Sequence, residues 1–394
     1  MSWFPSRSAT RRASSSALTA ALVFSFTAIE AVAFTAAERE AVLSHGPWPP
    51  PAKRDPSNRV SGKPEAIEFG ERLFFSPGLS GTGGVLCASC HEPWRGHADG
   101  RPRALGIAPA DRNTQSIVNV RLQRWFGWDG ANDNLWAQSI RPLLEPREMR
   151  SSAADVAAAV RGDTGLAGLY AKAFAGPLPA ADEALLVDVG KALAAYQETL
   201  VSGRTPFDDF RDALARGDAS AAARYPAQAR QGLRIFIAKG DCARCHAGPA
   251  FSDGSFHRGG IESKLENGTP DLGRQGGIRK LLSSRYNLLG SYIDDPARAS
   301  AGGTRAAAAE RDVAGAFRTP GLRDVTLTAP YMHDGSLANL CEVLLRHPGG
   351  GASFTPDESR DLLAFLESLT AAGPARFPGE NSPACRDSRV TIRP

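Results

Sequence analysis

The sequence of 394 residues lacks the features that mark membrane-spanning and nucleic-acid-binding proteins. Beyond residue 33 it has no long apolar run, so we expect no membrane span in the mature chain. The formal net charge is only +4, and part of it comes from arginines near the N-terminus. No basic cluster is interleaved with aromatic residues, so nucleic-acid binding has no support.

Cysteine and histidine are also scarce, with six and seven residues. Four of the cysteines nevertheless occur in two copies of one pattern, Cys-x-x-Cys followed directly by histidine, at 87–91 and 242–246. Roughly one shuffled chain in several hundred would hold even one copy. A structural zinc site usually combines two cysteine pairs, or one pair with spaced histidines, and a redox dithiol gives the histidine no role.

Covalent attachment of haem uses every residue of both patterns. Two thiols add to the porphyrin, and the next residue binds the iron through its imidazole. His91 and His246 are then the proximal iron ligands. We therefore predict two covalently bound haem c groups, attached through Cys87, Cys90, Cys242 and Cys245.

The N-terminus has the layout of a secretory signal peptide. Arginines precede an apolar run over 17–29, and the small residues Ala-Val-Ala follow at 31–33. We expect cleavage after Ala33 and a periplasmic protein; an uncleaved membrane anchor is the alternative. In an oxidising compartment we expect a disulfide between Cys341 and Cys385, with two unpaired thiols as the alternative.

The rest of the chain predicts a mainly α-helical protein with long loops and little β-structure. An amphipathic segment precedes each haem pattern, and the helical stretch 181–203 is expected to bury one face, formed by Leu185, Leu186, Val189, Leu193, Tyr196 and Leu200. We expect two tandem cytochrome c-like haem domains. The expected segments are a signal peptide (1–33), an extended lead-in (34–62), an N-terminal haem domain (63–223), a C-terminal haem domain (224–372) and a tail (373–394).

The two haem patterns, with RNTQSIVN and WDG between them and LRDVTLTAPYMHDGS after them, resemble the bacterial di-haem cytochrome c peroxidase and MauG family. The likeness covers about residues 60–372, and the stretch RWFGWDGANDNLWAQSIRPLLEPREM is most similar to the MbnH-type branch. The resemblance implies a peroxidase that activates hydrogen peroxide at the N-terminal haem and draws electrons through the C-terminal haem from a partner protein. For the MbnH-type branch it implies oxidation of a partner tryptophan.

The resemblance also implies roles for individual residues. The family spacing from the tryptophan of WDG places a glutamine ten residues later and a glutamate twenty residues later, and Trp128, Gln138 and Glu148 match it. Trp128 would bridge the haems, Gln138 would hold the peroxide, and Glu148 would be the acid–base group. A calcium ion is implied between the domains, bound by oxygen atoms of Asn113, Thr328 and Pro330.

Two positions depart from the family pattern. Relatives that require reductive activation have a second histidine on the N-terminal haem, where this chain has Ile107, so we expect an open peroxide site. His97 is the nearby histidine, either as a ligand or as a surface or propionate-contacting residue. At the second haem, the family count from the histidine of PYMH leads to His347 as the sixth ligand, and Met332 is its competitor.

The expected partners are hydrogen peroxide and an electron-donor or substrate protein, such as a small cytochrome, a cupredoxin or an MbnP-like protein. An aromatic route to the surface would use Trp94, Trp125 or Trp136. The alternative is a di-haem cytochrome that acts only in electron transfer, with side-chain ligands saturating both irons.

Overall fold

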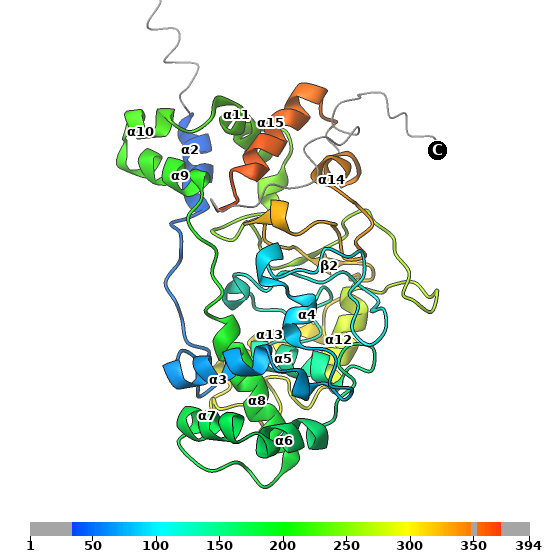
Figure 1. Cartoon of the computed structure of the whole chain (residues 1–394). Helices are drawn as coiled ribbons and strands as arrows, with labels where there is room; N and C mark the ends of the chain where they lie inside the picture. Colours follow the sequence, from blue (N-terminus) through cyan, green and yellow to red (C-terminus); the bar gives the residue numbers. More distant parts are fainter. Residues whose placement is uncertain (1–33, 348–352, 372–394) are drawn as a thin grey trace, which may run out of the picture.

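The computed structural model describes residues 34–347 and 353–371. Figure 1 shows helices gathered towards both ends of an elongated molecule, with long loops between them. In the described residues, the only sheet is an antiparallel pair, β1 (Phe256–His257) and β2 (Phe317–Arg318). The expectation of a mainly α-helical fold with little β-structure is confirmed.

The α-helices of the described residues are α2 (Ala36–Ser44), α3 (Pro64–Phe74), α4 (Cys87–Cys90), α5 (Leu135–Leu144), α6 (Ala153–Gly162), α7 (Thr164–Phe174), α8 (Asp182–Gln197), α9 (Pro206–Arg216), α10 (Ala219–Ala223), α11 (Ala227–Ile237), α12 (Arg274–Ser283), α13 (Gly302–Ala307), α14 (Leu340–Arg346) and α15 (Pro356–Glu367). Short 3-10 helices are η1 (Pro77–Leu79), η2 (Pro93–Arg95), η3 (Val120–Leu122), η4 (Cys242–Arg244), η5 (Ala299–Ala301) and η6 (Val325–Leu327). None of these helices has both the length and the apolar character needed to cross a bilayer.

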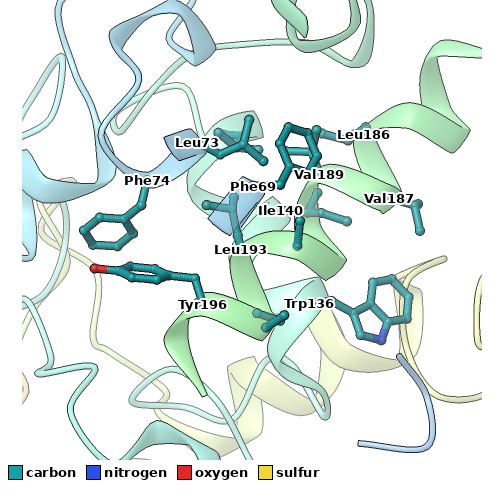
Figure 2. Close-up of a cluster of buried hydrophobic side chains, with 14 of the residues drawn as sticks. Phe69, Leu73, Phe74, Trp136, Ile140, Leu186, Val187, Val189, Leu193 and Tyr196 are labelled. Carbon is teal, nitrogen blue, oxygen red and sulfur yellow. The ribbon is translucent and has the colours of Figure 1, made fainter. Parts of the chain in front are cut away.

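Helix α8 forms the centre of the first core. Helices α3, α5 and α6 pack around it, and Figure 2 shows the side chains that meet there. We expected one buried face, but every residue from Leu185 to Gln197 is buried. The spacing of the large apolar residues identifies only the most apolar face of the helix. Neighbouring helices also cover its other faces, which are rich in alanine.

Glycine allows the closest helix contacts in both halves of the molecule. A side-chain carbon at Gly70 of α3 would overlap the Ala192 carbonyl of α8, and one at Gly232 of α11 would overlap the Asp361 carbonyl of α15. Both glycines begin the same short pattern, Gly-x-Arg-x-Phe, at 70–74 and 232–236. In each half, the helix before the haem pattern therefore packs directly against the backbone of a later helix: α3 against α8 in the first half, and α11 against α15 in the second.

The second core joins α2, α9, α11 and α15. The predicted extended lead-in is wrong over Ala36–Ser44, because Thr35 and Glu38 form a capping box that starts α2. Phe207 and Phe210 of α9 also belong to this core. The packing therefore favours a division of the two halves before α9, instead of after residue 223. The two-domain organisation stays a proposal.

The signal peptide, the tail and Cys385 lie outside the described residues, so the disulfide with Cys341 also stays a prediction.

Candidate functional site

A cavity of about 790 Å³ lies beside the first haem pattern. Cys87, Cys90 and His91 line it, together with apolar side chains such as Leu135 and Leu193. Cofactor pockets in proteins have volumes of about 300–1,000 Å³ and mostly apolar walls. The size and lining therefore fit a flat apolar macrocycle attached to the two thiols.

The imidazole of His91 is held in the tautomer that iron requires. Its Nδ1 lies 3.0 Å from the carbonyl oxygen of His97. A carbonyl can only accept, so Nδ1 carries the proton and Nε2 keeps its lone pair for a metal. His97 has φ +55°, and this left-handed turn brings its carbonyl back towards His91.

The second pattern repeats this arrangement. His246 Nδ1 lies 3.1 Å from the carbonyl oxygen of Phe251, which has φ +53°. In both halves, a residue in the left-handed region five or six positions downstream fixes the histidine. The two histidines are therefore oriented alike, as proximal ligands of two similar groups would be.

The thiols do not resemble those of a redox dithiol. Burial raises the pKa of Cys87 and of Cys90 to about 12, and that of Cys242 to about 11. Reactive dithiols have lowered thiol pKa values. No cluster of three or more His, Cys, Asp or Glu side chains in the described residues is arranged to bind a metal. Thioether attachment remains the chemistry that the cysteines fit.

Glu148 and Gln138 line the same cavity as His91. Arg141 binds the Glu148 carboxylate through both terminal nitrogens, with Nη1 to Oε1 at 2.8 Å and Nη2 to Oε2 at 3.2 Å. Gln138 accepts a hydrogen bond on Oε1 from Asn132 at 2.8 Å, so its Nε2 is the end that can donate. The cavity thus combines a carboxylate that can accept a proton with an amide that can hold a polar substrate.

The elements around α5 explain these positions. The Asn134 side chain caps the helix, and Trp136 and Ile140 anchor it in the first core. Pro142 lies in the last turn, and the chain then reverses, because the Met149 amide donates to the Pro142 carbonyl. This reversal brings Glu148 back beside the helix that carries Gln138.

Ile107 lies on a loop that closes against Glu148. Its amide donates to the Glu148 carbonyl at 3.0 Å, and a side-chain carbon at Gly106 would lie 2.5 Å from the same oxygen. Among the described residues, His91 is the only histidine that lines the cavity. His97 instead contributes its backbone carbonyl to the orientation of His91.

Trp128 lies between this cavity and the second half of the molecule. It lines the cavity, and its Nε1 donates to the Asn113 carbonyl at 2.9 Å. Its ring centre is 6.4 Å from that of His333, which stacks on Phe317 at 3.5 Å. The indole therefore contacts groups from both halves.

His347 lies close to His246. The ring centres of His246 and His347 are 6.3 Å apart, with an interplanar angle of 71°. Metal–nitrogen bonds of about 2 Å on each side of one iron would place two imidazole centres about 6 Å apart. Met332 lies in the same region as His347. A side-chain carbon at Gly259 would lie 3.2 Å from Met332 Cε and 3.8 Å from His347 Nδ1.

The residues of the expected calcium site come from segments that meet. The Asn113 amide donates to the His333 carbonyl at 2.9 Å, and its side-chain nitrogen donates to the Arg101 carbonyl at 2.8 Å. Thr328 and Pro330 precede His333 on the same loop. These contacts join the two segments, and the calcium site stays a prediction.

Arg141 and Asn132, which bind Glu148 and Gln138, were not identified from the sequence. Arg141 follows Gln138 by three positions on a helix, a spacing that places both side chains on one side and could have indicated that Arg141 also lies at the cavity. Of the three aromatic route candidates, Trp94 is 73% exposed, whereas Trp136 is fully buried and bonded to Ser57. Trp125 is partly buried.

Comparisons with known proteins agree with this geometry. The family model described as di-haem cytochrome c peroxidase matches residues 64–216. The methylamine utilization protein MauG of Methylorubrum extorquens is 36% identical over 323 residues, covering 78% of this chain and 79% of that protein. The cytochrome c551 peroxidase of Nitrosomonas europaea is 28% identical over 315 residues, covering 79% of this chain and 81% of that protein.

A solved structure, of a MauG-like protein associated with microbial copper homeostasis, is 26% identical with a TM-score of 0.61. The match covers 82% of this chain and 95% of that chain. The two haem patterns, the oriented histidines and the similarity to MauG along most of both chains lead to one conclusion. The chain belongs to the di-haem cytochrome c peroxidase and MauG family of peroxidase enzymes, with two haem cofactors.

Proposed function

We propose that this protein is a periplasmic oxidase that uses hydrogen peroxide at the cavity of His91 to oxidise a partner protein. One observation carries the proposal: His91, Glu148 and Gln138 line one cavity, and among the described residues no second histidine lines it. The cavity of His91 thus contains two groups suited to peroxide, and among the described residues it contains no competing imidazole.

The chemistry at this face follows from the two side chains. The haem, when bound, supplies the iron at which the peroxide O–O bond is cleaved. Cleavage requires a proton to move from one peroxide oxygen to the other, and the Glu148 carboxylate can accept and return it. Gln138 Nε2 can donate a hydrogen bond that holds the peroxide. Arg141 fixes the Glu148 carboxylate in place through two contacts.

The second haem site relays electrons in this proposal. His246 and His347, whose ring centres are 6.3 Å apart, would both bind its iron, and this would leave no position for peroxide there. A second imidazole in place of a methionine gives a lower reduction potential, and this suits oxidation of a partner more than simple scavenging of peroxide. Trp128 connects the two sites.

The partner is a protein whose tryptophan loses electrons to the enzyme. The 36% identity to MauG, the structural similarity to a MauG-like protein associated with copper homeostasis and the MbnH-like stretch support this class of reaction. A small cytochrome, a cupredoxin or an MbnP-like protein could supply the electrons. A calcium ion bound by Asn113, Thr328 and Pro330 would join the segments that connect the two halves.

Electron paramagnetic resonance of the resting ferric protein, repeated after addition of peroxide, tests the proposal. We expect one high-spin signal from the haem at His91 and one low-spin signal from the haem at His246, with the high-spin signal lost on addition of peroxide. Two low-spin signals, together with no reaction unless the protein is first reduced, would contradict the open site. No reaction under any condition would favour the electron-transfer cytochrome.

A further inference from the structure

Arg318 is a buried cation for which the described part of the chain supplies no carboxylate. The residue is 3% exposed. Its side chain reaches only backbone carbonyls, with Nε 3.4 Å from Gly127 and Nη1 3.3 Å from Thr319. Both distances are long for an N–H···O bond, and a guanidinium has five N–H donors. Burial lowers the pKa of Arg318 to about 10, so the group is still charged at neutral pH.

The fold neutralises comparable arginines with carboxylates. Arg323 binds Asp208 at 2.7 Å, and Arg274 binds Glu310 at 2.6 Å, although both side chains are as deeply buried as that of Arg318. A buried charge without a partner is strongly destabilising, whereas a paired one is tolerated. Arg318 therefore requires an anion that the described chain does not provide.

The position of Arg318 indicates where that anion comes from. Its amide donates to the Trp128 carbonyl at 2.8 Å, and Gly127 lines the cavity beside the first haem pattern. In the other direction, β2 pairs with β1, and the Thr319 carbonyl accepts from Ser252, six residues after His246. The guanidinium thus lies between the two haem sites.

We propose that Arg318 binds a propionate carboxylate of a haem and is the fixed counter-ion of that group. A haem carries two propionates, and a planar guanidinium can bind a carboxylate through two parallel bonds. The inference rests on the presence of both haems, as the proposed function also does. The propionate could belong to either haem, and the experiment below separates the two.

The other charged groups around β2 already have partners. Asp253 binds His257 at 2.8 Å, and Asp129 binds Arg112 at 2.7 Å. His333 stacks on Phe317, next to Arg318. Loss of the charge at position 318 should therefore change the properties of the haem more than the protonation of these residues.

The test is to measure the reduction potentials of both haems in the wild type and in Arg318→Gln between pH 5 and 8. Loss of the cation favours the ferric state, so the potential of the haem that carries the propionate should fall. It should also become more dependent on pH, because an unpaired propionate takes up a proton as the pH falls. The high-spin and low-spin absorption bands show which haem changes.

Arg274→Gln is the matched control, since it removes an equally buried arginine that has its own carboxylate. It should lower the melting temperature without changing either potential or its pH dependence. Potentials of Arg318→Gln that superimpose on those of the wild type, with both haems attached, would overturn the proposal. These measurements need no peroxide, so failure of the proposed function would not affect them.

Arg318→Lys covers the case in which Arg318→Gln does not retain its haems. It keeps the charge but not the planar pair of donors. The propionate bending bands in its resonance Raman spectrum should shift for one haem. Bands identical to those of the wild type would also overturn the proposal.

Discussion

At the scale of single residues, the contact between Arg141 and Glu148 gives the carboxylate one defined position in the cavity. Glu148→Gln keeps the size of the side chain but cannot accept a proton from peroxide. We expect both haems and their spectra to be retained and peroxide activation to slow by about 10²-fold or more. Stopped-flow absorption after addition of peroxide measures the rate.

Asp182→Asn is the control for this substitution. Asp182 is also a carboxylate held by an arginine, with Arg161 at 2.6 Å, but it lies at the start of α8 and does not line the cavity. Its loss should leave peroxide activation unchanged. Equal rates in Glu148→Gln and the wild type would remove Glu148 from the mechanism.

The second prediction at this scale concerns the sixth ligand of the haem at His246. His347→Ala should convert the low-spin haem to high-spin and leave the haem at His91 unchanged, because the imidazole opposite His246 is removed. Met332→Ala should leave both spin states as in the wild type. Electron paramagnetic resonance of the two ferric variants decides between the ligands. A high-spin signal gained in Met332→Ala and not in His347→Ala would identify Met332 as the sixth ligand.

At the scale of helices, the two glycine crossings should be equally sensitive to added volume. Gly70→Ala and Gly232→Ala each place a methyl group against the backbone of the facing helix, which we expect to cost about 1–3 kcal/mol of unfolding free energy. Calorimetry of the two variants measures the loss of stability.

Gly168→Ala is the matched control for the crossings. Gly168 lies within α7, and a side-chain carbon there would meet nothing within 4 Å. Alanine has the higher helix propensity, so this variant should be as stable as the wild type or more stable by up to about 1 kcal/mol. Equal losses of unfolding free energy in all three variants would show that the two helix contacts are no more sensitive to an added methyl group than an open position.

At the scale of the whole molecule, Glu198 connects pH to stability. Burial raises its pKa from 4.5 to about 7, and Ser61 donates to its carboxyl group at 2.8 Å. Between these two values the unfolded chain loses the proton while the folded chain keeps it. The folded state therefore loses stability as pH rises from 4.5 to 7, by at most about 3 kcal/mol.

Glu198→Gln removes this titration while keeping an oxygen that can accept from Ser61. The variant should match the wild type below pH 4.5 and should melt at a higher temperature above pH 7. Thermal melts from pH 4 to 9 measure the difference. Parallel curves over the whole range would contradict a raised pKa at this carboxyl.

How far the sequence predicted this molecule depended on whether the signal was local. The haem patterns and the helices before each pattern depend on neighbouring residues, and they were predicted. The capping box that begins α2 also depends on neighbouring residues, but an extended segment was predicted there because the following stretch is rich in proline. The burial of α8 on every side, the pairing of Arg141 and the isolated charge of Arg318 depend on partners distant in the chain, which periodicity cannot identify.

The hydrogen bond from Trp128 to the Asn113 carbonyl decides what an indole at this position does when it loses an electron. An oxidised indole is far more acidic than the neutral ring and readily gives up its N–H proton to a base. A backbone carbonyl accepts hydrogen bonds but is far too weak a base to take that proton. The indole should therefore keep its proton and remain a strongly oxidising cation, which regains an electron quickly. Trp128 is thereby suited to pass a charge on between the two halves and not to trap it as a neutral radical.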